Sequence, residues 1–187
     1  MENQGLRELY ISELKDIYSA ENQMVKALPK LAKASSSTEL RQGFENHLDQ
    51  TKVHVQRLEE IFRSLEESPK GKKCAGMEGL VKEGSEAIQE DFPATIKDAA
   101  LIGAARRVEH YEIAAYSTVV ALAGALGETD HASLLAETLE EEKATDEKLN
   151  ELFSEVGEAN SDEESDKDSH SESAKDQSAK KRRTRAA

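Results

Sequence analysis

Apolar residues recur every three or four positions along four long stretches of the first 156 residues, which is the pattern of amphipathic helices. We expect Ser36 and Glu39 to form a capping box at the start of the second helix and Asp130 to cap the fourth. Pro29 is expected to kink the first helix or end it early. The first helix is predicted to run from Leu6 to about Ala34 and the second from Ser36 to about Leu65. The third should begin within residues 93–95 and end at Leu126, and the fourth should begin at Asp130 and end before Gly157.

The connections between these helices differ sharply in length. A few serines join the first helix to the second, and residues 127–129 join the third to the fourth, so each pair should form an antiparallel hairpin. Almost thirty residues separate the hairpins, and a short helix is predicted there. Two hairpins with one long crossover are the connectivity of ferritin-like bundles. The sequence therefore predicts an all-α, ferritin-like four-helix bundle over residues 1–156.

The composition changes at Gly157. Residues 157–187 carry eight acidic and seven basic side chains and almost nothing apolar. Such a segment cannot bury enough surface to offset the entropy of ordering, so it is predicted to be a disordered charged tail. Its basic tip, residues 180–185, follows an acidic stem. A solubilising tail is the favoured interpretation, and docking of the tip onto nucleic acid or another partner is the alternative.

The whole chain of 187 residues is acidic and poor in large apolar side chains, with a net charge of −13, 37% apolar residues and no Trp. Cys74 is its single cysteine, which excludes an internal disulfide framework and fits a reducing compartment. Residues 1–4 have no features of a signal peptide, and no apolar run reaches the length of about eighteen residues needed to cross a membrane. A soluble, cytoplasmic protein without a membrane span is expected.

Ionisable residues interrupt the apolar face of each long helix once. Counted from the short loops at 1.5 Å per residue, these interruptions agree in depth within about one or two turns and lie near mid-bundle. Burying one unpaired carboxylate costs several kcal/mol, so carboxylates and imidazoles at one depth predict a divalent metal centre between the helices. The candidate ligands are Glu21 in the first helix, His47 and His54 in the second, Glu109 and Glu112 in the third, and Glu142 and Asp146 in the fourth.

Each candidate also has a structural interpretation. Glu21 and Glu112 could pair with lysines at the rim of the bundle, Glu142 and Asp146 could belong to a solvated acidic run, and His47 and His54 could be satisfied core histidines. For Tyr18 and Tyr116, one turn from Glu21 and Glu112, core filling is favoured over donation to the ligands. His131, which lies far from the centre, and His170, which lies in the tail, are excluded, and His110 lies off the apolar face and is expected to be a surface or dimer residue.

The predicted ligands follow the usual di-metal pattern only in part. That pattern takes one Glu from each of two helices and a Glu-x-x-His from each of the other two. The second helix instead offers His47-x-x-Gln50 and His54, and the fourth offers Glu142 with Asp146 four residues later. The site is therefore expected to be di-metal-like but irregular, with either one ion or two.

Eight short motifs resemble the bacterial YciE/YciF family. They are DIYSAENQ at residues 16–23, LPKL at 28–31, HLDQT at 47–51, RLE at 57–59, CAGMEGL at 74–80, DAALI at 98–102, VEHYEIAAY at 108–116 and ETLEEEKATD at 137–146. The resemblance covers roughly residues 6–156 and implies a rubrerythrin-related bundle, a homodimer, a di-iron or similar centre, a link to stress responses and ferroxidase-type activity. Gln50 stands where relatives can carry Glu, which would remove one anionic ligand.

Three functional hypotheses follow. The leading one is a redox protein that binds iron, or else manganese, at mid-bundle and reacts it with oxygen or peroxide. The second is a stress-induced structural or nucleoid-associated protein without functional metal, whose basic tip contacts DNA. The third, a large metal-storage shell, is disfavoured because the sequence offers no clear cage interface. No nucleophile elbow, P-loop or dinucleotide fingerprint is present to support another chemistry.

Overall fold

The computed structural model describes residues 2–155, so the predictions made for the tail and its basic tip lie outside the described residues. The described chain forms five helices and no strand. Their bounds are Glu2–Ala34 for α1, Thr38–Ser64 for α2, Ala75–Gln89 for α3, Ala94–Leu126 for α4 and residues 129–155 for the last helix. Within residues 2–155 we find no helix that is both long and apolar enough to pass through a bilayer.

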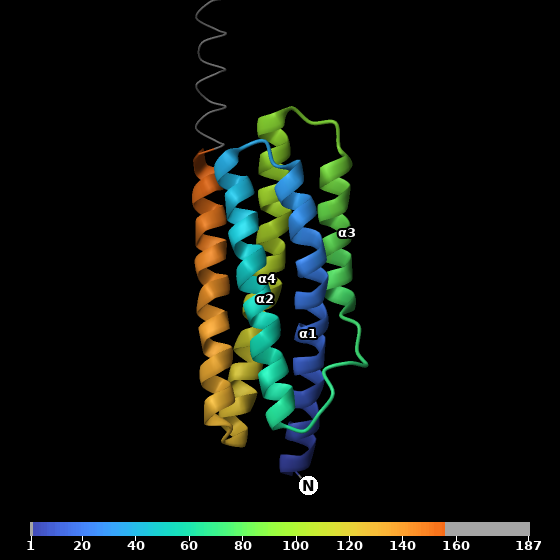
Figure 1. The fold of residues 1–187 in the computed structure, drawn as a ribbon, viewed down its shortest axis with the longest axis vertical. Coiled ribbons are helices and arrows are strands. Elements are labelled where there is room, and N and C mark those ends of the chain that lie inside the picture. Colours follow the sequence, from blue (N-terminus) through green and yellow to red (C-terminus); the bar gives the residue numbers. More distant parts are fainter. Residues whose placement is uncertain (1, 156–187) are drawn as a thin grey trace, which may run out of the picture.

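Four long helices run along the longest axis of the molecule, and the shorter α3 lies at one side of them (Figure 1). α1 packs against α2 and α4, and α3 packs against α1 and α4. The chain reverses direction between α1 and α2 and again between α4 and the last helix, while the connection from α2 to α4 carries α3 (Figure 1). The predicted pair of hairpins and the long crossover with its short helix are thus confirmed.

The start of α2 differs from the predicted capping box. Ser37, not Ser36, is the N-cap residue, and its hydroxyl accepts a hydrogen bond from the backbone N–H of Leu40 at 3.3 Å. The backbone N–H groups of Ser36 and Ser37 donate to the carboxylate of Asp98, at 2.8 Å and 2.7 Å. A buried carboxylate from α4 therefore takes the place that the predicted box assigned to Glu39.

The predicted cap at Asp130 was wrong, and the first helix does not end early at Pro29; a kink at Pro29 stays a prediction. The last helix begins at residue 129, and the carbonyl of Glu128 accepts from the N–H of Ala132 at 2.9 Å, so Asp130 lies within the first turn rather than at the cap. α1 also continues through Pro29 to its end at Ala34. The flanking Leu28 and Leu31 are buried in the core, and their burial offsets the cost of about 3 kcal/mol for a proline inside a helix.

The core consists of two apolar clusters with a polar layer between them. On α1, Leu14 and Ile17 belong to one cluster, Met24 and Leu28 belong to the other, and Glu21 lies between the two pairs. The same order recurs on the other three long helices. The buried polar residues between the clusters there are His47, Thr51, His54, Glu109, Glu112 and Glu142.

Candidate metal centre

The polar layer brings six of the seven predicted ligands together in two groups that share one residue. The inner position is formed by Glu21, His54 and Glu142, and the outer position by His47, Glu109, Glu112 and Glu142. Within each group, one ligand atom from every residue lies within 4.8 Å of all the others. Glu142 is the shared carboxylate, and all six side chains are buried, His47 being the most exposed at 4%.

Most of the unpaired buried polar atoms of the described residues lie in this cluster. Eight buried side-chain oxygen or nitrogen atoms have no hydrogen-bond partner, and six of them belong to the two positions. A buried polar atom without a partner costs about 1–3 kcal/mol. A cation would supply the missing partner. The six atoms are Glu21 Oε2, His54 Nδ1, Glu109 Oε2, Glu112 Oε1 and both carboxylate oxygens of Glu142.

His54 is oriented by a charged pair on its far side. Its Nε2 lies 2.9 Å from Glu141 Oε2, and both terminal nitrogens of Arg57 bind the Glu141 carboxylate. A carboxylate only accepts, so Nε2 keeps its proton and Nδ1 is the nitrogen that faces the inner position, 3.1 Å from Glu142 and 3.4 Å from Glu21. This is the arrangement typical of a metal-ligating histidine, whose other ring nitrogen donates to a carboxylate.

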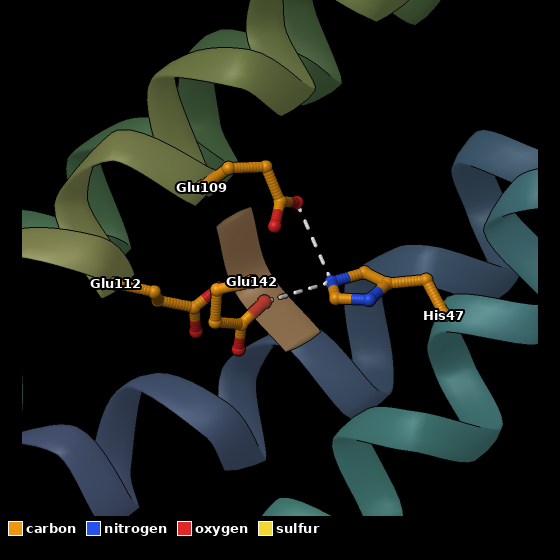
Figure 2. Close-up of side chains that lie close together, drawn as sticks. All are labelled: His47, Glu109, Glu112 and Glu142. Atoms are coloured by element: carbon orange, nitrogen blue, oxygen red, sulfur yellow. Dashed lines mark ion pairs between the residues drawn. The ribbon is translucent and has the colours of Figure 1, made fainter. Parts of the chain in front are cut away.

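His47 has a weaker partner behind it. Its Nε2 faces the outer position at 3.4 Å from Glu109 and 3.8 Å from Glu142, the two contacts drawn as dashed lines in Figure 2. Its Nδ1 lies 3.4 Å from the hydroxyl of Thr145, which itself donates to the backbone carbonyl of Glu141 at 3.0 Å. A neutral hydroxyl at this distance orients an imidazole less firmly than an ionised carboxylate does.

Tyr116 packs beside the inner position. Its hydroxyl donates to Glu21 Oε1 at 2.5 Å, the side chain is fully buried, and its ring centroid lies 6.3 Å from that of His54. Tyr116 therefore fills the core and also holds a predicted ligand. Tyr18 does not reach the cluster, because its hydroxyl donates to Glu59 at 3.0 Å on the surface.

The structure does not bring Asp146 into either group. Its carboxylate accepts from Arg106 at 2.8 Å and faces His110 at 3.5 Å, so it already has cationic partners at the edge of the bundle. Three residues after Glu142, Thr145 faces His47, and one residue more turns Asp146 toward α4. His110 is exposed, as expected, and His131 lies outside the polar layer, 2.7 Å from Ser64.

Although their spacing in the sequence is irregular, the six candidate ligands have the residue composition of a typical di-metal site. Four glutamates and two histidines face one another, which is the set that two Glu and two Glu-x-x-His motifs would supply. Threonines stand at Thr51-x-x-His54 and Glu142-x-x-Thr145 where the motif would have Glu and His. The two missing donors are supplied from elsewhere in the same layer, by Glu109 and His47. Gln50 is exposed and is not among the six.

Protons balance part of the negative charge of the cluster when no metal is bound. Burial lowers the pKa of His47, but the charges of Glu109 and Glu142 outweigh burial and raise it to about 9. Burial likewise lowers the pKa of His54, and contacts with Glu142 and Glu21 raise it to about 10. Burial raises the pKa of Glu142 to about 8. Protons held by these groups therefore offset part of the negative charge of the cluster at pH 7, and a metal ion must displace them.

Arg57 and Glu141, which orient His54, were not predicted from the sequence. Glu141 lies in the same acidic run as the candidate ligands Glu142 and Asp146, and Arg57 lies in the RLE motif at residues 57–59, but the sequence predicts no role in the site for either residue. A usable signal exists, since Arg57 follows His54 by one helical turn and Glu141 precedes Glu142 directly. Only the pairing of α2 with the last helix joins them.

Known proteins resemble this chain over most of its length. A family model described as "Domain of unknown function (DUF892)" matches residues 5–162. Protein YciF of Escherichia coli (strain K12) is 47% identical over 153 residues, which are 81% of this chain and 92% of YciF. The crystal structure of the E. coli stress protein YciF matches with a TM-score of 0.80 at 45% identity and covers 82% of this chain and 97% of that chain.

Two other solved structures share the fold. YcfI from Rhodopseudomonas palustris matches with a TM-score of 0.75 at 41% identity, over 78% of this chain and 92% of that chain. A ferritin-like, diiron-carboxylate protein from Bacillus anthracis str. Ames matches with a TM-score of 0.63 at 18% identity, over 79% of this chain and 96% of that chain, which shows likeness of fold alone. The predicted ferritin-like fold and the resemblance to YciF are confirmed.

Proposed function

Because the chain belongs to the DUF892 family and its ferritin-like bundle encloses a buried His/Glu cluster, we propose that the inner and outer positions bind two divalent transition-metal ions. Iron is the metal proposed first, with manganese as the alternative. The proposed activity is the oxidation of Fe(II) by oxygen or peroxide, and the proposed setting is a stress response, as the name of the relative suggests.

The observation that supports this proposal best is the concentration of unpaired donor atoms in one buried layer. Six such atoms lie in the two positions, and both oxygens of the shared Glu142 are among them. The histidines do not satisfy the cluster by themselves, because Glu21 Oε2, Glu109 Oε2 and Glu112 Oε1 have neither a hydrogen bond nor an ion pair among the described residues. Four carboxylates match the four positive charges of two divalent ions, and two imidazoles favour iron or manganese over magnesium or calcium.

The protein side chains have separable roles in this proposal. Arg57 and Glu141 fix the ring of His54, and Tyr116 fixes Glu21. The apolar clusters shield the polar layer from water at both of its ends, which strengthens the charge interactions there. Anionic ligands stabilise Fe(III) over Fe(II), so iron bound as substrate would lose an electron to the oxidant more readily.

Elemental analysis after aerobic loading with Fe(II) or Mn(II) tests the proposal. The wild type should retain up to two ions per chain, and Glu21→Gln and Glu112→Gln should each retain fewer. Glu60→Gln is the matched control, because Glu60 is exposed on α2, one helical turn or more from the cluster, and should load like the wild type. A folded wild type that retains no transition metal would exclude the proposed centre. The homodimer and the contact with nucleic acid stay predictions from the sequence.

A further inference from the structure

The two positions differ in their distance from solvent. An open pocket of about 410 Å³ lies between α2 and the last helix, and His47 and Glu109 form part of its wall. Neither Glu21 nor His54 lines this pocket, and both are fully buried. The outer position is therefore next to a path to solvent, and the inner position lies behind it.

Polar side chains line part of the pocket, beside apolar ones such as Phe44 and Leu149. Oxygen-bearing side chains line it from both helices, and the single lysine there, Lys148, is paired with Glu151 at 3.0 Å. Its charge is thereby offset. The acidic character of the whole chain adds a general attraction for positive ions. The oxygen-bearing residues that line the pocket are Asn46, Asp49, Gln50, Glu109 and Thr145.

Two small residues face this space from opposite walls. Gly43 lies on α2 and Ala144 lies on the last helix. A Cβ atom added at Gly43 would meet no atom within 4 Å, so the space in front of this helix is open. A glycine inside a helix costs about 1 kcal/mol relative to alanine, and no packing contact at Gly43 requires it. A large side chain here would fill the pocket without displacing the core.

We propose that this pocket is the route by which a divalent cation reaches and leaves the outer position, whereas the ion at the inner position exchanges slowly. The inference rests on the proposed metal centre and goes further, because it assigns the order of exchange and the path. His47, with its neutral partner Thr145, is the ligand on that path, and His54, held by Glu141 and Arg57, is the ligand behind it.

The test is the rate of Co²⁺ binding, followed by its visible absorption, in the wild type and in Gly43→Trp. The wild type should bind in two kinetic phases, and an added chelator should remove one ion rapidly and the other slowly. Gly43→Trp should slow the fast phase of uptake and of removal about tenfold or more at unchanged final stoichiometry. Gly43→Ala should leave both rates within about twofold of the wild type, because a methyl group leaves the pocket open.

Two further variants control for the general effect of a new tryptophan and for a failure of Gly43→Trp to fold. Gly79→Trp is the matched control, since Gly79 is another helical glycine with no atom near an added Cβ, yet it does not line the pocket. Ala144→Trp fills the pocket from the other wall and replaces Gly43→Trp if that variant does not fold. Full loading at wild-type rate in a folded pocket-filling variant would overturn the route. Absence of Co²⁺ binding in the wild type would instead overturn the metal centre itself.

Discussion

The inner and outer positions contain similar ligands in different surroundings. His54 of the inner position is fully buried and is held by an ionised carboxylate that Arg57 holds in turn. His47 of the outer position lies beside a pocket and has a neutral hydroxyl, that of Thr145, as its distant partner. The difference shows that a bundle can hold one buried imidazole firmly and its neighbour loosely, although four helices contribute to one layer.

A change at Glu142, the carboxylate shared by both positions, should have the largest effect, because it acts on the inner and the outer position together. Glu142→Gln removes one negative charge from both positions, so we expect both ions to bind more than about 100-fold more weakly, beyond the 10–100-fold typical of an outer partner. Above about pH 8, where Glu142 loses its proton, the metal-free variant should be more stable by about 1–3 kcal/mol, because a buried carboxylate is replaced by a neutral amide. Co²⁺ titration and denaturant unfolding measure the two effects.

The exposed neighbour supplies the control for this variant. Glu140→Gln changes the same charge two residues away, where the side chain pairs with Lys143 on the surface. It should alter neither affinity. If Glu142→Gln lost one ion and kept the other at wild-type affinity, Glu142 would belong to a single position.

The pH dependence should act on both positions at once. The folded-state pKa values of about 9 for His47, 10 for His54 and 8 for Glu142 all exceed the ordinary values of 6.5 and 4.5, so the metal-free folded chain binds more protons than the unfolded chain. The resulting stabilisation is full below the ordinary pKa values and disappears as pH rises through the folded-state pKa values. The Tm of the metal-free protein should therefore fall between about pH 6.5 and 10.

Metal binding reverses this dependence. Each proton that an ion displaces should strengthen binding about tenfold per pH unit below the pKa of that group. Calorimetry in two buffers with different ionisation enthalpies measures the number of protons released. A Tm that rises over this range in the metal-free protein, or binding without proton release at pH 7, would contradict the protonated cluster.

Glu141→Gln sharpens the comparison by acting on one position. The neutral amide binds Arg57 less strongly and no longer offers His54 an ionised acceptor, so the inner ion should bind about 10–100-fold more weakly. The outer ion should be unaffected. A two-step Co²⁺ titration resolves the two affinities, and equal weakening of both steps would show that the relay through Glu141 is not confined to the inner position.

The sequence was sufficient to place six candidate ligands at one depth in the bundle, because burial leaves a periodic trace along each helix. It was insufficient wherever a partner comes from another helix. The spacing of Asp146 from Glu142 predicts a ligand, but in the structure Asp146 pairs with Arg106 of α4. The predicted cap of α2 failed for the same reason, since Asp98 of α4 binds that helix end.

The roles of Arg57 and Glu141 were missed because their meaning depends on which helices are neighbours. An arginine one turn after a histidine and a glutamate beside a candidate ligand are common on solvated helix faces. Only when α2 lies against the last helix do they form one chain of contacts that ends on His54 Nε2. Periodicity records how deeply a residue is buried, whereas the partner of that residue is set by packing.

The smallest expected effect tests the weaker half of the comparison. Thr145→Val keeps the shape of the side chain and removes the hydroxyl that lies 3.4 Å from His47 Nδ1. A long contact to a neutral group contributes at most about 1 kcal/mol, so the outer ion should bind no more than about fivefold more weakly, and the inner ion should not change. If Thr145→Val instead weakened the outer ion as strongly as Glu141→Gln weakens the inner one, the two imidazoles would be held equally well. Any difference between the inner and the outer ion would then come from the pocket alone. The carboxylate of Glu141 beside His54 and the hydroxyl of Thr145 beside His47 would have the same effect on metal affinity.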